Sequence, residues 1–223
     1  MTRSVVTDPT TALDHAGRDV EHRAPLPARM VFIAGPIVVG AVVFDIDSYY
    51  DIFEEIDDSK KLSATKREAL YPQIFSAARF AGVSLVGHEE IDERGLPAAH
   101  KQVMLSAYRR ARSNLGAGRC AAIVDGASHE GYRPWMGGES SIFADRADQQ
   151  SLSVAAASII AKVWRDTFME MMGRAYSGYG FEHNKGYPTP DHLRALREFG
   201  PCTIHRRSFR PVNEGIVECG NDE

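Results

Sequence analysis

The sequence contains few cysteines and no long hydrophobic run, and each of these features argues against particular classes of protein. Its three cysteines show no C-x-x-C spacing, which argues against a disulfide framework or a thiolate zinc site and favours a reducing, intracellular setting. The longest apolar run, 32–44, is interrupted by glycine and proline and falls short of the roughly 20 residues that span a bilayer. The N-terminus lacks the apolar core of a secretory signal. We therefore expect a cytoplasmic protein with no membrane partner.

The sequence also lacks an excess of positive charge. Its 26 basic and 30 acidic residues give a net charge of −4, which argues against a broad basic coat for nucleic acid but leaves room for a local one. Basic residues gather at 60–61, 109–112 and 205–210, although most such clusters are solvated faces. The chain is 43% hydrophobic over 223 residues, which is enough apolar material for a globular domain.

The apolar pattern predicts an α/β fold with a small C-terminal helical extension. Strands are expected at 37–44, 83–88 and 120–124, and helices at 58–81, 98–115 and 151–172. Residues 1–31 are polar and contain prolines, so we expect an irregular N-terminal segment. Residues 213–223 form an acidic tail, which we expect to fray.

Asp148 stands just upstream of the long helix expected at 151–172. The first half of this helix is rich in small residues, so another element must pack close to it. The carboxylate sits at the positive end of the helix, where the first-turn N–H groups favour negative charge. An acid in this position fits an ordinary helix cap, which is the commoner case, and it also fits one arm of a metal site.

Asp125 follows a buried strand and precedes Gly126. Open α/β sheets place their chemistry at the carboxyl ends of strands, but Asp-Gly is also a common turn pair. Taken together, Asp125 and Asp148 suggest a divalent-ion site with oxygen ligands. Such a site suits phosphodiester hydrolysis, in which metal ions activate water and neutralise the leaving oxygen.

Seven segments follow one another in a specific order along the chain. They are IAGPIVVGAVVF (33–44), DSKKLS (58–63), EEIDERG (89–95), VDG (124–126), DQQSLSVAAASIIAKVWRD (148–166), GYGFEHNKGYPT (178–189) and GPCTIHRRSFRPV (200–212). In this order and spacing they resemble bacterial ribonuclease HII, and the likeness covers residues 32–212 as one catalytic domain that includes the C-terminal extension.

This resemblance implies a fold, an activity and a metal site. The fold is a ribonuclease-H-like mixed sheet flanked by helices. The activity is that of a hydrolase, an endonuclease that cuts the RNA strand of RNA–DNA hybrids and incises at ribonucleotides embedded in duplex DNA. Four acids of the family, an adjacent Asp-Glu pair and two later Asp, hold Mg²⁺ or Mn²⁺, and Asp125 and Asp148 match the two later ones. We expect a monomer.

The N-terminal acid pair departs from the family pattern. Asp14 takes the place of the first acid, and His15 replaces the Glu. Gly17 and Arg18 match the family's Gly-Arg-Gly, which senses the ribose 2′-OH, whereas Asp19 replaces the second Gly. An imidazole suits Mn²⁺ better than Mg²⁺, so His15 is either a ligand that biases the site toward Mn²⁺ or a surface histidine.

The other substrate residues match better. Tyr187 matches the family tyrosine that packs on the sugar beside the cleavage junction, and Lys60 and Lys61 are expected to contact phosphate as point charges. Two hypotheses follow. The first is a metal-dependent endoribonuclease in which Asp14, Asp125 and Asp148 are catalytic. The second, which depends on the loss of the Glu at His15, is a weakened paralogue that binds hybrid or junction duplex without efficient cleavage.

Overall fold

The computed structural model describes residues 2–7, 32–44, 56, 62–115, 120–126 and 140–214. Their contacts divide the chain into two compact units. The first, called here the sheet unit, comprises Met1–Thr11, Val38–Leu85 and His100–Trp164. The second, called here the C-terminal unit, comprises Ala12–Ile37, Val86–Ala99 and Arg165–Glu223.

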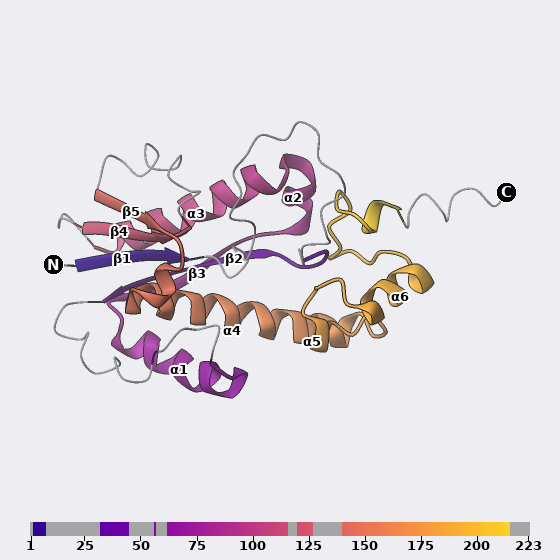
Figure 1. Ribbon diagram of the computed structural model, residues 1–223, viewed down its shortest axis with the longest axis horizontal. Helices are drawn as coiled ribbons and strands as arrows, with labels where there is room; N and C mark the ends of the chain where they lie inside the picture. Colours follow the sequence, from indigo (N-terminus) through magenta and orange to yellow (C-terminus); the bar gives the residue numbers. More distant parts are fainter. Residues whose placement is uncertain are drawn as a thin grey trace. The chain divides into compact units, whose positions relative to one another are not determined.

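The sheet unit is built on a five-stranded mixed sheet of order β3-β2-β1-β4-β5. The strands are β1 (Thr2–Thr7), β2 (Ile37–Phe44), β3 (Phe80–Val86), β4 (Cys120–Asp125) and β5 (Ser140–Ala144). Strand β1 lies in the centre, antiparallel to β2 and parallel to β4, and β5 continues the parallel half beside β4 (Figure 1). This is the mixed sheet that the sequence analysis expected.

The central strand corrects the expectation that residues 1–31 are irregular throughout. Residues Thr2–Thr7, TRSVVT, form β1, and their β-branched side chains favour an extended backbone. The run is too short and too polar to stand out in the sequence, because its stability comes from pairing on both sides with β2 and β4. Residues 8–31 lie outside the described part of the chain.

The described residues also include the helical segments α1 (Ala64–Ala77), α2 (His88–Arg94), α3 (Leu96–Ser113), the 3₁₀ turn η2 (Ala147–Gln149), α4 (Leu152–Ala175), α5 (Phe181–Asn184) and α6 (Pro190–Phe199). The helices expected at 98–115 and 151–172 are confirmed as α3 and α4. The helix expected at 58–81 is shorter, since the Ser63 side chain caps its start by accepting from the Lys66 N–H at 3.2 Å. Neither β5 nor α2 was expected. No helix among the described residues is long and apolar enough to cross a membrane.

Helix α4 packs directly against β2, and the small residues in its first half make this possible. All eight residues of β2 are buried, and Val42 joins Ala156 and Ile160 in one core cluster. A Cβ atom built on Gly40 would lie 2.1 Å from the Ala157 carbonyl oxygen. The helix backbone therefore rests on the strand, and α1 covers the same side of the sheet while α3 covers the other (Figure 1).

In the C-terminal unit, three short segments are joined by backbone hydrogen bonds. The Ile33 N–H donates to the Gly186 carbonyl at 2.9 Å, and the Arg206 N–H donates to the Ile33 carbonyl at 2.9 Å. The Gly35 N–H completes the set by donating to Ile204 at 2.9 Å. We call this arrangement of residues 33–35, 184–187 and 204–206 the clasp; the expected helical extension around it is present as α5 and α6.

Candidate active site

The 3₁₀ turn η2, which contains Asp148, contacts the carboxyl end of β4, where Asp125 lies. Asp125 is the last residue of the strand, and its Oδ1 accepts a hydrogen bond from the Ala147 N–H at 2.8 Å. Ala147 immediately precedes Asp148 within η2. Both acids are buried, with exposed fractions of 8% for Asp125 and 3% for Asp148. The structure thus brings together the two aspartates that the sequence singled out.

The position of Asp148 does not match that of a helix cap. Helix α4 begins at Leu152, and the Ser151 carbonyl accepts the first hydrogen bond of the helix, from Ala155 at 2.9 Å. The N-cap residue is the one whose carbonyl does this, so the cap is Ser151. Asp148 sits in a separate 3₁₀ turn before it. Of the two interpretations that the sequence left open for Asp148, the geometry does not support the helix cap.

Two neighbouring buried carboxylates are costly, because burial removes their hydration and like charges repel. A bound divalent cation offsets both costs. Carboxylate oxygens are the donors that Mg²⁺ and Mn²⁺ accept, so this pair fits such an ion. No group of three His, Cys, Asp or Glu that could hold a metal occurs among the described residues. The remaining predicted ligands, Asp14 and His15, lie outside them.

Strand β1 ends at the level of Asp125. The parallel register pairs Val6 with Val124, so Thr7, the last residue of β1, comes level with Asp125, the last residue of β4. The carboxyl ends of β1 and β4 therefore lie side by side. Of the other predicted site residues, Gly17, Arg18, Lys60 and Lys61 also fall outside the described part of the chain, as Asp14 and His15 do.

Tyr187 belongs to the C-terminal unit and is half-buried. Its ring centroid lies 4.0 Å from that of Phe32, with the two planes tilted by 36°. Its backbone N–H donates to Asn184 at 2.9 Å, and its carbonyl accepts from Thr189 at 2.8 Å. Burial raises the pKa of the Tyr187 hydroxyl above its ordinary value, although the nearby positive charge of Arg165 opposes this. The phenol is therefore neutral at physiological pH and presents a flat apolar face with one polar tip.

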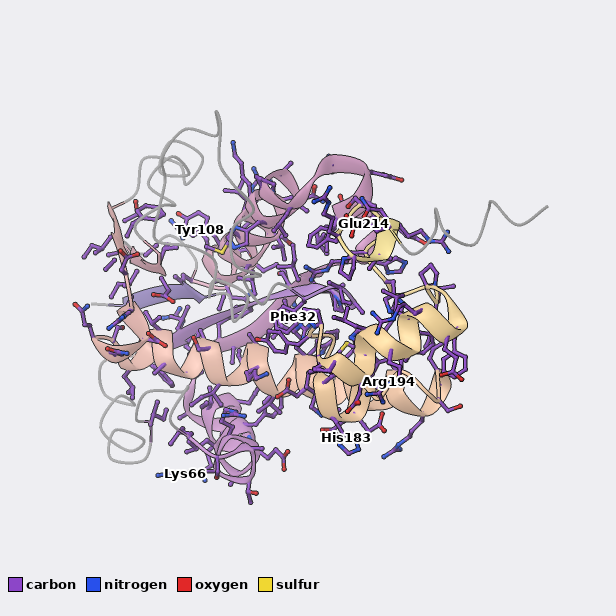
Figure 2. All side chains as sticks on the ribbon, turned by 45° about the vertical axis from the view of Figure 1, so that its right-hand side comes forward. Phe32, Lys66, Tyr108, His183, Arg194 and Glu214 are labelled. Atoms are coloured by element: carbon purple, nitrogen blue, oxygen red, sulfur yellow. The ribbon has the colours of Figure 1, made fainter. Side chains whose placement is uncertain are left out.

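Arg165 fixes the loop that carries Tyr187, a role that the sequence analysis did not foresee. The side chain is fully buried. It donates to the Lys185 carbonyl at 2.8 Å, to Ala34 at 3.2 Å and to Pro36 at 3.3 Å. Its guanidinium also lies 3.5 Å from the centre of the Phe32 ring, which is labelled in Figure 2. The Arg165 side chain thus contacts two of the three clasp segments and also Phe32, the aromatic partner of Tyr187.

Asn184 and Arg206 are further structural braces of the clasp. The Asn184 side chain donates to the Tyr179 carbonyl at 2.7 Å and accepts from the Gly186 N–H at 2.8 Å. Arg206 is 1% exposed, and its Nε donates to the Gly35 carbonyl at 3.0 Å. Both residues lie within the segments that resemble ribonuclease HII, but nothing in the sequence distinguishes a buried structural residue from one that contacts the substrate.

Comparison with known proteins decides the family. The family model described as Ribonuclease HII matches residues 32–212. The chain belongs to the ribonuclease HII family. It is 40% identical to the ribonuclease HII of Geobacillus thermodenitrificans over 201 residues, which covers 90% of this chain and 70% of that protein. It is 41% identical to the enzyme of Agrobacterium fabrum over 197 residues, covering 88% and 82% of the two chains.

Solved structures place this ribonuclease HII in the ribonuclease H fold. The crystal structure of ribonuclease H2 from Pyrococcus horikoshii OT3 matches with a TM-score of 0.75 at 23% identity, covering 98% of both chains. The Mn²⁺ complex of Bst-RNase HIII matches with a TM-score of 0.67 at 19% identity, covering 97% of this chain and 70% of that one. The expected fold class is confirmed.

The matched range of the family model separates the predicted site residues of this ribonuclease HII into two groups. Lys60, Lys61, Asp125, Asp148 and Tyr187 fall within residues 32–212. The N-terminal candidates, from Asp14 to Arg18, precede that range. The family assignment therefore stands on the part of the chain that carries the later two acids.

Proposed function

We propose that this ribonuclease HII uses Asp125 and Asp148 to hold divalent cations for hydrolysis of the RNA strand in RNA–DNA hybrids and at ribonucleotides embedded in duplex DNA. The single observation that carries the proposal is that two buried aspartates stand in contacting elements of a chain of this family, with Asp125 hydrogen-bonded to the residue before Asp148. The family assignment makes the chain a hydrolytic nuclease of the ribonuclease H type and does not favour the alternative of a binding paralogue without efficient cleavage.

The chain's own residues prepare the site in two ways. The Ala147 N–H fixes one oxygen of Asp125, so that carboxylate keeps a constant orientation whether or not an ion is bound. Burial beside Asp148 excludes bulk water and strengthens the attraction for a cation. Asp125 and Asp148 would hold the divalent cation, which would supply a water molecule of lowered pKa and positive charge beside the scissile phosphate.

The first acid of the site has two candidates. The resemblance to the family pattern favours Asp14, with His15 as a neighbouring ligand. The strand register favours Asp8, which is bonded to Thr7, the residue that comes level with Asp125. Asp14 stands six residues further along the chain than Asp8. We infer that one of these two carboxylates completes the aspartate pair.

The choice between Asp8 and Asp14 can be made by measuring metal binding as well as cleavage. Asp8→Asn and Asp14→Asn should be compared by Mn²⁺ titration calorimetry, with Asp145→Asn, which changes an exposed acid, as a matched control. The variant that removes the first acid should lose both affinity for Mn²⁺ and cleavage. If Asp14 is that acid, His15→Glu should also raise activity in Mg²⁺. Retained binding and cleavage in both variants would exclude both candidates.

The principal experiment is cleavage of a DNA duplex that contains one ribonucleotide, in Mg²⁺ and separately in Mn²⁺. Wild-type protein should cut in at least one metal, and Asp125→Asn should abolish cutting. Asp145→Asn is the matched control, because Asp145 is an exposed acid three residues before Asp148. Binding without cleavage in either metal would instead support the weakened paralogue. Full activity of Asp125→Asn would overturn the site assignment.

Other finer features stay predictions. Substrate contacts are proposed for Gly17, Arg18, Lys60, Lys61 and Tyr187. The choice between Mn²⁺ and Mg²⁺ rests on the chemistry of His15, and the Mn²⁺ in a related ribonuclease HIII structure is a property of that protein. The monomeric state and cytoplasmic location are expectations from the sequence.

A further inference from the structure

A pair of buried histidines lies behind Tyr187 in the C-terminal unit. His192, in α6, places its Nδ1 2.7 Å from the Tyr187 carbonyl oxygen. The Nε2 atoms of His192 and His205 are 3.0 Å apart. At the far end, His205 Nδ1 lies 3.0 Å from the Cys202 backbone nitrogen and 3.1 Å from its Sγ. Three polar contacts in series thus connect Cys202 to the backbone of Tyr187, and the Cys202 Sγ adds a second contact at the His205 end.

The chemistry at the two ends of this row determines the proton positions. A carbonyl oxygen can only accept, so His192 Nδ1 carries a proton and donates to Tyr187, which leaves His192 Nε2 with a lone pair if the ring is neutral. The Cys202 backbone N–H can only donate, so His205 Nδ1 carries a lone pair and His205 Nε2 carries the proton. The two deductions are independent, and they agree: the His205 Nε2–H donates a hydrogen bond to the lone pair on His192 Nε2.

The surroundings keep both rings neutral. Both histidines are fully buried. The Phe181 ring meets His192 edge-on at 5.2 Å, and the Tyr179 ring lies 5.1 Å from His205. Burial lowers the pKa of His192, and it lowers that of His205 to about 4.

The charged groups near His205 act in the same direction. Positive charge on His192, Arg207 or His88 opposes a further proton on His205, while the Cys202 backbone raises the pKa of His205. A proton on His192 Nε2 would set two N–H groups against each other across the 3.0 Å contact with His205, and a proton on His205 Nδ1 would face the Cys202 N–H, also 3.0 Å away. The arrangement therefore permits one proton pattern, with both rings neutral.

We propose that His192 and His205 are positioning residues that set the direction of the Tyr187 peptide and hence the placement of its ring against the substrate. This inference rests on the proposed substrate role of Tyr187. The Tyr187 carbonyl accepts from only two described donors, the Thr189 N–H and His192 Nδ1. His192 is the one that approaches from another element, and His205 holds its ring in the donating orientation.

The proton pattern can be tested directly on the wild-type protein. Nitrogen-15 NMR of the imidazole rings at pH 7 should show two neutral histidines of opposite tautomer, His192 protonated at Nδ1 and His205 at Nε2. A charged ring at pH 7, or the same tautomer in both, would overturn the proposal without any variant being made.

The effect on Tyr187 is tested with variants of His192 in the full-length protein. His192→Leu removes the donor, whereas His192→Asn keeps an N–H near the position of Nδ1 and should rescue it. His183→Asn is the control, because the His183 side chain is 87% exposed and points away from the unit (Figure 2). His192→Leu should raise KM for a duplex with one ribonucleotide by about fivefold, the factor that corresponds to one neutral hydrogen bond, and should leave kcat and Mn²⁺ binding unchanged.

A double variant separates this proposal from the proposed function. In a Tyr187→Ala background, His192→Leu should cause no further rise in KM. A full additional rise would mean that the histidine does not act through Tyr187, and the proposal would be wrong. If Tyr187→Ala itself leaves KM unchanged, the substrate role of Tyr187 fails, while the NMR result still decides whether the histidine pair exists as described.

Discussion

Gly40 offers a sharp test of how α4 lies on the sheet. The residue is in the middle of β2, and a Cβ atom there would meet the Ala157 carbonyl oxygen at 2.1 Å and the carbonyl carbon at 2.9 Å. Ordinary van der Waals contact begins at 3.4 Å. Gly40→Ala must therefore move the helix backbone by about 1 Å, since the atoms it strikes belong to the main chain and cannot rotate away.

The expected loss of stability follows from two opposing effects. Overpacking of a closed core costs about 1–3 kcal/mol and occasionally more, and a clash with backbone belongs at the upper end. Replacing glycine by alanine in a strand recovers about 0.5–1 kcal/mol from the lower entropy of the unfolded chain. We therefore expect Gly40→Ala to lower the free energy of unfolding by about 2 kcal/mol. Because η2 and Asp148 immediately precede α4, the same shift should lower kcat, by up to about 100-fold for a 1 Å misplacement.

Urea unfolding followed by circular dichroism measures the first effect, and cleavage kinetics measure the second. Gly87→Ala is the matched control, because Gly87 has an ordinary φ of −73° and no atom within 4 Å of its Cβ position; its effect should stay within about 0.5 kcal/mol. If Gly40→Ala were as stable as the control, the backbone of α4 could not lie in direct contact with β2 at Gly40.

Three further predictions concern the site and the clasp. Asp148→Asn should abolish the increase in Tm that Mn²⁺ causes in the wild-type protein. In the presence of a chelator the variant should melt no lower than the wild type, because the substitution relieves repulsion between buried carboxylates; a lower Tm in chelator would contradict this. Burial lowers the pKa of His205 to about 4. Below pH 6.5 the unfolded chain therefore binds a proton at this histidine that the folded chain does not bind, and the free energy of unfolding falls as the pH is lowered. Between pH 7 and 5 the free energy of unfolding should drop by about 2 kcal/mol more in wild-type protein than in His205→Gln, measured in urea; equal drops would refute it. Gly186→Ala adds a Cβ at a φ of +87°, 2.5 Å from the Ala34 carbonyl oxygen, so it should weaken duplex binding in a fluorescence titration while calorimetry shows unchanged Mn²⁺ affinity.

The features that the sequence revealed are those in which local pattern and tertiary structure agree. The continuous apolar run at 37–44 became the fully buried β2, and the small-residue face of 151–172 became the contact with Gly40. The place of Asp125 at the carboxyl end of β4 was predictable because the residue follows a recognisable buried strand.

The features that escaped prediction depend on partners distant in the sequence. Strand β1 is short and polar, and only its two neighbours in the sheet make it a strand. Arg165 looks like a surface residue of a long helix until carbonyl groups from two other segments surround it. The His192–His205 contact joins residues of a helix and a following loop whose closeness no local pattern encodes.

The central place of β1 has a consequence for the order in which the molecule folds. Strand β1 is made before the other described strands, but its parallel partner begins at Cys120, more than a hundred residues later. Contacts between residues so far apart in the chain form slowly, because the loop between them must close before the pairing stabilises it. The antiparallel pairing with β2 becomes available much earlier, so a β1–β2–β3 half-sheet can assemble while the β4 edge of β1 waits unpaired. An open strand edge is prone to pair with other chains. The two acids of the proposed site are made with β4 and just after β5, the part of the chain that completes the sheet.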